Sequence, residues 1–405
     1  MTPTEPPPRI PFVDLAAQSR RLRPEIDRRI ADVLDHGRYV MGPEVDELEV
    51  ELGRWAGGAS AVAVSSGSDA LLIALLALGV GRGGNRRRDA VFVPTFTFTA
   101  TAEVVLLAGA VPVFVDVREE DFLIDLESLD REYEAVRAAG VATPKAVIPV
   151  DLFGLPVAEE PLAEWAASRQ LEVISDAAQS FGARRDGSPV GSLAPITTTS
   201  FYPAKPLGGY GDGGAVLCVE PATAEIVRSI REHGQSADRY DIVRLGVNGR
   251  LDSLQAAVLL AKLTVFEQEL AARRAVAAGY SERLRAVGSS AATPWRVSVP
   301  ECGAGPESGV ESSWAQYTLR VDDAAGQPSA GTRDALRAHL DRAGIPTAVY
   351  YPRPMHLQPA YESYGRGAGS LPVSESLADR VVSLPMHPYL DQDALDRICE
   401  RIANA

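Results

Sequence analysis

The sequence predicts an α/β protein in which a mostly parallel sheet is covered by helices on both faces. Short, nearly uninterrupted apolar runs alternate with helical patterns from residue 61 to residue 219, the order that parallel strands joined by crossover helices produce. With 405 residues, 46% of them hydrophobic and 23% charged, the chain can bury a substantial core in more than one lobe. We predict a large domain over residues 1–255 and a smaller α+β domain over residues 256–405.

The elements of the large domain follow from its apolar runs. The predicted strands cover residues 61–64, 91–94, 111–117, 146–150, 173–176, 198–201 and 215–219. Helices are predicted over residues 69–78 and 100–107, and a helical pattern over residues 20–55 is interrupted by a loop at 37–43. Because ligands of such sheets collect at the carboxyl ends of the strands, Asp176 at the end of one strand is a candidate site residue.

Further helices are predicted over residues 222–232 and 253–269, and a long helix from residue 270 leads into the small domain. The elements of that domain are predicted over residues 315–321, 332–343, 346–351 and 394–402. Residues 1–9, 81–88 and 300–309 are predicted to be mobile or exposed. The basic stretch at 81–88 is more simply a solvated connection than a nucleic-acid surface.

Composition excludes several classes of protein. A net charge of −14 argues against a general nucleic-acid binder, which needs a concentrated basic surface. No apolar stretch is long enough to span a bilayer, and the first residues lack the features of a signal peptide, so a cytoplasmic protein is predicted. Cys218, Cys302 and Cys399 are far apart and have no CxxC spacing, so neither a disulfide framework nor a metal site is predicted.

Asp176 and Lys205 are candidate catalytic residues. Alone, an aspartate at a strand end usually caps a turn, and a lone lysine is usually on the surface. Here Lys205 follows Asp176 by 29 positions, and each residue lies beside a segment that is predicted to be a buried strand. Pyridoxal phosphate needs an amine that forms a Schiff base and a carboxylate that keeps its pyridine nitrogen protonated. We therefore predict that these two residues bind this cofactor and act in catalysis.

A phosphate site is predicted next to this pair. Gly67 and Ser68 lie in a turn between a strand and a helix, where backbone N–H groups can face an anion, although a serine here is also a common helix cap. Ser200 precedes Lys205 by five positions, close enough for its hydroxyl to join the same site. The glycines between residues 208 and 214 allow a tight turn, around the cofactor or simply before the next strand.

An aromatic ring is expected against the face of the cofactor. Residues 93–100 carry Phe96 and Phe98 near the end of a predicted strand, where one ring could stack on the pyridine and exclude water. We choose Phe98, with Phe96 as the alternative. Either ring could instead belong to the core.

Several motifs together resemble one known family. They are IPFVD at 10–14, GRYVMGP at 37–43, SSGSD at 65–69, TFTF at 95–98, DAAQ at 176–179, SFYPAK at 200–205, GVNGR at 246–250, YP at 351–352 and LPMHP at 384–388. In this order they resemble the pyridoxal-phosphate nucleotide-sugar aminotransferases of the DegT/StrS type. The resemblance spans nearly the whole chain. It implies fold type I of the aspartate aminotransferase superfamily, with a mostly parallel seven-stranded sheet in the large domain.

The resemblance also implies roles for individual residues. Lys205 would form the Schiff base, Asp176 would pair with the pyridine nitrogen, and Gln179 would approach the ring hydroxyl. Gly67, Ser68 and Ser200 would hold the phosphate. Asn248 of the neighbouring subunit would complete that phosphate site, with Arg250 in a supporting or substrate role, so the active unit implied is a homodimer with shared sites.

The implied reaction moves an amino group from an amino acid, for which glutamate is expected, to a nucleotide-linked ketosugar. Segments 312–318 and 345–352 resemble those of relatives that aminate 3-keto sugars, and Tyr351 and His356 are the candidate substrate contacts. Both have structural alternatives, because a tyrosine before proline can simply pack and a solitary histidine is often structural. Relatives commonly have histidine where this chain has Asp151, and some have it where Tyr350 stands, which leaves the sugar open.

Two other functions remain open at this point. One keeps the cofactor but acts on a cyclitol ketone or dehydrates a sugar, although dehydratases of this type replace the Schiff-base lysine by histidine. The other is a non-catalytic regulatory protein of the same fold, which fold alone does not exclude. The retained Lys205, Asp176 and Gln179 favour the enzyme.

Overall fold

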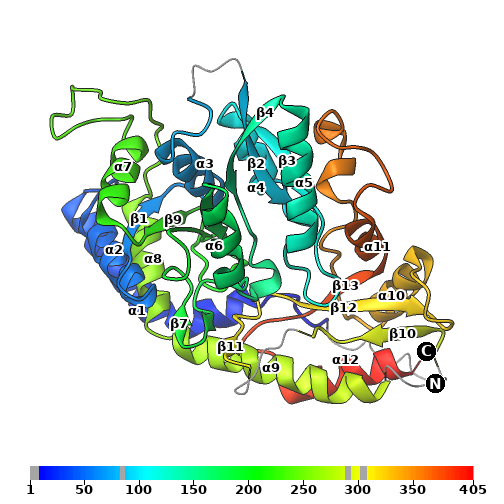
Figure 1. Cartoon of the computed structure of the whole chain (residues 1–405). Coiled ribbons are helices and arrows are strands. Elements are labelled where there is room, and N and C mark those ends of the chain that lie inside the picture. The colour runs from blue at the N-terminus through cyan, green and yellow to red at the C-terminus, as the bar shows by residue number, and fades with distance from the viewer. Residues whose placement is uncertain (1–8, 83–86, 288–292, 302–307, 405) are drawn as a thin grey trace.

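A seven-stranded sheet runs through the centre of the molecule in this computed structural model, which describes residues 9–82, 87–287, 293–301 and 308–404 (Figure 1). Its strands are β1 (Ser60–Val64), β2 (Arg88–Pro94), β3 (Val111–Val115), β4 (Ala142–Val147), β5 (Glu172–Asp176), β8 (Ile196–Ser200) and β9 (Gly214–Cys218). The strand order is β1-β9-β8-β5-β4-β2-β3. Only β9 runs antiparallel to its neighbours, β1 and β8. The predicted fold class is confirmed.

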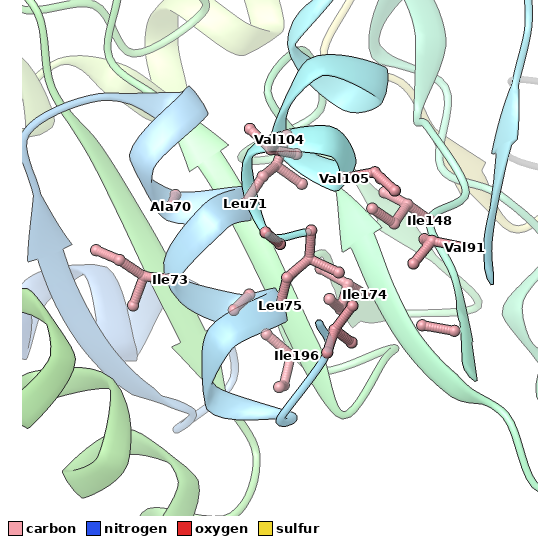
Figure 2. Close-up of a cluster of buried hydrophobic side chains, with 14 of the residues drawn as sticks. Ala70, Leu71, Ile73, Leu75, Val91, Val104, Val105, Ile148, Ile174 and Ile196 are labelled. Carbon is pink, nitrogen blue, oxygen red and sulfur yellow. The ribbon is translucent and has the colours of Figure 1, made fainter. Parts of the chain in front are cut away.

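Helices cover one face of this sheet with a continuous apolar core. They are α3 (Gly67–Ala77), α4 (Ala100–Leu107) and α7 (Pro221–Arg231). Figure 2 shows Leu71 and Leu75 of α3 lying with Val104 and Val105 of α4 over the isoleucine and valine side chains of the strands. Each such buried side chain stabilises the fold by roughly 1.5–3 kcal/mol. This core fixes the start of α3 against the sheet edge where β5 ends.

The opposite face is covered in two parts. Helices α5 (Leu126–Ala139) and α6 (Glu159–Ser168) pack on β2, β4 and β5. Helices α2 (Pro43–Trp55) and α8 (Ser253–Leu263) pack on β1 and β9. Alternate residues of the same strands enter the cores on the two faces, as a sheet buried on both sides requires.

The helices that flank the sheet differ in detail from their predicted ranges. Helix α1 (Leu15–His36) begins earlier than residue 20 because Asp14 caps it, accepting a hydrogen bond from the backbone N–H of Ala17 at 2.8 Å. Gly37 ends it in the left-handed conformation, with φ of 70°. The predicted helix over 253–269 is instead two helices, because the chain turns at residues 264–265 and α9 (Phe266–Val287) begins there.

The C-terminal part forms a smaller α+β unit. Its antiparallel sheet has the order β10-β12-β13, with β10 (Trp295–Ser298), β12 (Tyr317–Asp323) and β13 (Val381–Leu384). Helices α9, α10 (Ala330–Arg342) and α12 (Gln392–Ala403) pack against it. Residues 346–351 form no strand there, and Ala348 makes a single bridge to Ser383.

Shorter elements connect the two parts. They are a small sheet of β6 (Arg184–Arg185), β7 (Ser188–Pro189) and β11 (Val310–Glu311), the short helices η1 (Leu152–Gly154), η2 (Met355–Leu357) and η3 (Pro359–Tyr361), and helix α11 (Pro372–Arg380). Cys302 and parts of the three stretches predicted to be mobile, residues 1–8, 83–86 and 302–307, lie outside the described residues. No helix in the described ranges is both long and apolar enough to cross a membrane.

The segment from η2 to α11 follows the small sheet in sequence but packs on the large one. The backbone N–H of Met355 donates to the carbonyl of Thr95 at 2.8 Å, and Met355, Tyr361 and Leu371 join the core under α3 and α4. Asp116, just after β3, accepts hydrogen bonds from the backbone N–H groups of residues 373 and 374 at 3.0 and 2.8 Å and so caps α11. The division at residues 255 and 256 stays a prediction.

Candidate active site

Asp176 ends β5 and lies almost fully buried, with 5% of its surface exposed. Its Oδ2 accepts a hydrogen bond from the Thr101 hydroxyl at 3.0 Å, and its Oδ1 accepts one from the backbone N–H of Ala178 at 3.2 Å. Burial raises the pKa of this carboxyl, while the two hydrogen bonds and the nearby Lys205 amine oppose that shift. The carboxylate is therefore held in one orientation at the carboxyl edge of the sheet.

Lys205 lies in the loop that connects β8 to β9, and the charge of Asp176 acts on the pKa of its amine. Burial lowers the pKa of the amine, and the carboxylate of Asp176 partly restores it. Although some of the side chain is solvent-accessible, protein atoms surround the amine densely enough for burial to dominate. Within the described part of the chain, the amine makes neither a hydrogen bond nor an ion pair, so it does not contact the Asp176 carboxylate directly. The structure thus brings the two predicted catalytic residues together.

Gly67 and Ser68 begin α3, and Gly67 lies against Ser200 at the end of β8. Ser66 caps α3, its hydroxyl accepting from the backbone N–H of Asp69 at 3.0 Å, which leaves the N–H groups of Gly67 and Ser68 without a partner among the described residues. A Cβ added to Gly67 would lie 2.6 Å from the Cβ of Ser200, so glycine keeps the space beside the Ser200 hydroxyl open. Two free N–H groups at a helix start and a hydroxyl suit a phosphate.

Gln179 lies beside Asp176 on the same turn and is buried. Its amide oxygen accepts a hydrogen bond from the backbone N–H of Phe153 at 2.6 Å, and its side chain acts to lower the pKa of the nearby Tyr351 hydroxyl. Burial, with Asp176 next in importance, raises the pKa of Tyr351. Tyr351, proposed from the sequence as a substrate contact, therefore lies against the same carboxyl and amide that the cofactor was predicted to use.

The two candidate aromatic residues lie in different environments. Phe98 is 55% exposed, with its ring centroid 6.5 Å from that of Tyr351. Phe96 is buried in the core, where it stacks on Phe122. An accessible ring beside Tyr351 fits a stacking role for Phe98, which stays a prediction, whereas Phe96 packs as a core residue.

Asn248 and Arg250 flank the start of α3 from outside. The backbone N–H of Ser65 donates to the carbonyl of Gly249 at 2.9 Å, and Arg250 bridges Val64. The Asn248 side chain is exposed, and the Arg250 guanidinium makes no hydrogen bond or ion pair to any described residue. Their roles toward a partner subunit and a substrate stay predictions.

His356 is placed differently from its predicted role as a substrate contact. It is 1% exposed, its Nδ1 lies 2.7 Å from the Thr95 hydroxyl, and its Nε2 lies 3.1 Å from a Glu375 oxygen. Both ring nitrogens are therefore occupied within the protein. This geometry favours the structural alternative, in which His356 joins η2 to the end of β2 and to α11.

Two polar side chains near Asp176, Thr101 and Glu159, were not among the residues singled out from the sequence, and Asp151 was noted only as a difference from relatives. Thr101 was included only as part of a helix, yet it donates directly to the carboxylate. Asp151 and Glu159 are buried behind it, and burial raises the pKa of Asp151 to about 7 and that of Glu159 to about 8. Asp151 accepts from the Ser180 hydroxyl at 2.5 Å and from the backbone N–H of Val157 at 2.8 Å. Their signal was polar residues at the ends of β4 and at the start of a helix covering β5.

Residues 20–403 match the model of the DegT/DnrJ/EryC1/StrS aminotransferase family. The chain belongs to this family. One relative is a UDP-2-acetamido-2-deoxy-3-oxo-D-glucuronate aminotransferase of Pseudomonas aeruginosa. The two sequences are 42% identical over 395 residues, which cover 98% of this chain and 100% of the relative. The resemblance inferred from the motifs is confirmed.

Solved structures agree. A DegT DnrJ EryC1 StrS aminotransferase from Brucella abortus superposes with a TM-score of 0.88 and is 44% identical, covering 97% of this chain and 98% of that one. NtdA from Bacillus subtilis, with bound cofactor PMP, has a TM-score of 0.82 and 26% identity, covering 97% of this chain and 84% of that one. Aminotransferases of this family depend on pyridoxal phosphate, so the predictions of this cofactor and of a transaminase are confirmed.

The residues present fit this cofactor. An unpaired amine lies near a buried carboxylate, and glycine at position 67 keeps the backbone of the α3 start open toward the Ser200 hydroxyl. The chemistry of this set matches an aldehyde, a ring nitrogen and a phosphate on one molecule.

Proposed function

We propose that this chain is a homodimeric transaminase that moves an amino group from L-glutamate to a nucleotide-linked 3-keto sugar. The observation that carries the proposal is the nearness of the Lys205 amine and the buried Asp176 carboxylate, whose charges each act on the pKa of the other. The 3-oxo sugar in the name of the P. aeruginosa relative, which this chain matches over its full length, supports the substrate class.

Pyridoxal phosphate, when bound, supplies an aldehyde carbon that accepts an amino group and a ring that withdraws electrons from the carbon being deprotonated. The N–H groups of Gly67 and Ser68 and the hydroxyl of Ser200 would hold its phosphate. Asp176 would keep a proton on its ring nitrogen, because a fixed carboxylate in a buried site favours the protonated ring.

The Lys205 amine is suited to proton transfer. Because burial lowers its pKa, more of the amine is neutral near neutral pH than in an exposed lysine. Nζ can then take the proton from the substrate carbon that carries the amino group and hold it for return later in the reaction. The overall exchange converts the amino acid to a 2-oxo acid and the ketone of the sugar to an amine.

Substrate and partner contacts are proposed from exposed groups. The unpaired Arg250 guanidinium suits an anionic part of the substrate, and Phe98 with Tyr351 would limit water near the reacting carbon. The exposed Asn248 would reach the phosphate of the neighbouring subunit. Exposed apolar side chains support burial in a dimer; they include Tyr202, Tyr210, Tyr240, Ile242, Val243 and Leu245. Free, buried Cys218 and Cys399 fit a reducing cytoplasm.

Borohydride reduction tests the cofactor site directly. The chain has three lysines, Lys145, Lys205 and Lys262, so reduction of the loaded protein followed by peptide mapping assigns the labelled amine without ambiguity. We expect label on Lys205, none in the K205A variant, and unchanged labelling in K145M. Label on another lysine, or a colourless protein that ignores added cofactor, would refute the proposal.

Two assays test the reaction and the shared site. Glutamate should convert the loaded protein to its amine form with release of 2-oxoglutarate, and a panel of UDP-linked and dTDP-linked 3-keto sugars and a cyclitol ketone should identify the acceptor by product mass. Mixing inactive K205A and N248D chains should restore activity, because a mixed dimer contains one intact site. Amination of the cyclitol ketone alone would contradict the proposed sugar acceptor. Failure of the mixed chains to regain activity would contradict an active site shared between subunits.

A further inference from the structure

Lys262 is a buried lysine for which the proposed reaction has no use. It lies on α8 and is 1% exposed. The chain contains 40 lysines and arginines, and since three are lysines, 37 are arginines. In a chain that supplies almost all of its cations as arginine, a lysine inside the protein points to a task for a compact ammonium group.

The Lys262 ammonium is held by two groups of one loop. Its Nζ donates a hydrogen bond to the carbonyl of Gly208 at 2.5 Å and lies 4.6 Å from the centroid of the Tyr210 ring. Burial lowers its pKa to about 8, and Glu269 on α9 partly opposes this shift. Both loop contacts lie within five positions of Lys205.

Gln255 holds the same loop from the same helix. It precedes Lys262 by seven positions, two helical turns, and so lies on the same face of α8. Its amide oxygen accepts from the backbone N–H of Tyr210 at 2.9 Å. Cβ atoms added at Gly209 and Gly211 would each lie 2.9 Å from the Gln255 amide, so the loop crosses closely over this side chain.

The loop is closed on its other side by the strands. The N–H of Gly209 donates to the carbonyl of Phe201 at 2.7 Å, and the N–H of Phe201 donates to the carbonyl of Gly213 at 2.7 Å. The N–H of Lys205 itself donates to the carbonyl of Tyr202 at 2.8 Å. With these ends fixed, the position of residues 208–210 decides the shape of the turn that carries Lys205.

We propose that Lys262, together with Gln255, is a positioning residue that clamps the 208–211 loop on α8 and so directs Lys205 toward Asp176. The inference rests on the proposed function, in which Lys205 is the reacting amine. An ammonium suits this place because it fits between a carbonyl and a ring face, whereas a planar guanidinium is larger and presents its donors as a fork. Lys262 acts through the loop and touches no reacting atom.

The test compares K262M with wild type and with K145M, which removes a half-exposed ammonium from β4. Three readouts apply to each loaded protein: the dissociation constant for pyridoxal phosphate, the pH midpoint of the absorbance change of the bound cofactor, and the borohydride-labelled lysine. For K262M we expect affinity to fall about tenfold, since a hydrogen bond to a charged group is lost, and the midpoint to shift. K145M should match wild type.

The outcomes separate the inference from the proposed function. Failure of wild type to label at Lys205 refutes the proposed function. Labelling of wild type at Lys205, with a K262M affinity and midpoint equal to those of K145M, overturns the clamp alone. If K262M only destabilised the fold, its unfolding temperature would fall while the pH midpoint of the bound cofactor stayed at the wild-type value, and that result also overturns the clamp. If K262M does not fold, Q255M decides, because the clamp requires a midpoint shift in this variant too and an unchanged midpoint overturns it.

Discussion

Replacing Thr101 by valine should move the acid limb of the reaction to higher pH. The Thr101 hydroxyl donates to Asp176 Oδ2 at 3.0 Å in a buried place, and valine keeps the shape of the side chain but not the donor. The ionised carboxylate loses one of its two protein hydrogen bonds, whereas its protonated form loses less. The pKa of Asp176, already raised by burial, should therefore rise further.

The size of the shift follows from the bond that is lost. A hydrogen bond to a charged group contributes about 1.5–3 kcal/mol, and about 1.36 kcal/mol corresponds to one pKa unit. The Ala178 N–H and the Lys205 amine remain in place, so the lower part of that range applies. We expect the acid limb of kcat/KM to move upward by about one unit, with activity retained above it.

The control is Thr97→Val. The Thr97 hydroxyl lies 3.2 Å from the Thr101 hydroxyl and makes no hydrogen bond to Asp176, so T97V removes a neighbouring buried hydroxyl with little effect on the carboxylate. Profiles of kcat/KM against pH for wild type, T97V and T101V would show the shift in T101V alone. An acid limb at the same pH in all three proteins would refute the assignment of that limb to Asp176.

Three further predictions concern other contacts. Gly67→Ala should weaken cofactor binding about tenfold, because overpacking costs about 1–3 kcal/mol and the new Cβ would lie 2.6 Å from that of Ser200. Gly331→Ala is the control, because its new Cβ would have its nearest neighbour at 3.9 Å. Equal cofactor affinities of the two variants in an absorbance titration would contradict a phosphate site between Gly67 and Ser200. Asp116→Ala should lower the free energy of unfolding by about 1–2 kcal/mol through loss of the α11 cap, measured by urea unfolding, and an unchanged midpoint would count against it. Burial lowers the pKa of His387 from 6.5 to about 4, so the unfolded chain binds a proton that the folded chain does not; stability should fall as pH drops through that interval, and His387→Gln should show a smaller fall.

The strands of the large sheet could be predicted because each is a short apolar run between turn residues. All seven are present, although β4 begins at Ala142 and not at residue 146, because Thr143, Pro144 and Lys145 weaken the apolar pattern at its start. Helices α5 and α6 were not predicted. Both are amphipathic and rich in charge, so their sequences resemble solvated connections until the sheet beneath them is known.

The candidate site could be located from the sequence where its residues lie close together along the chain. Asp176, Gln179, Ser200 and Lys205 come from two neighbouring strand ends, and the order of strands along an α/β chain places such ends at one edge. Thr101 and Lys262 could not be found this way, because their partners are 75 and 54 positions away. Their roles depend on helix packing, which local pattern does not encode.

The path of the C-terminal segment limits how this protein can be recombined with its relatives. A chimera joined near residue 256, built to exchange one sugar preference for another, would import residues 355–371 together with the foreign lobe. The foreign residues at positions 355, 361 and 371 would then have to fit a core shaped for Met355, Tyr361 and Leu371, and Asp116 would face an unfamiliar helix start. Grafts that end before residue 352 would keep the contacts of residues 355–374 with the large sheet intact.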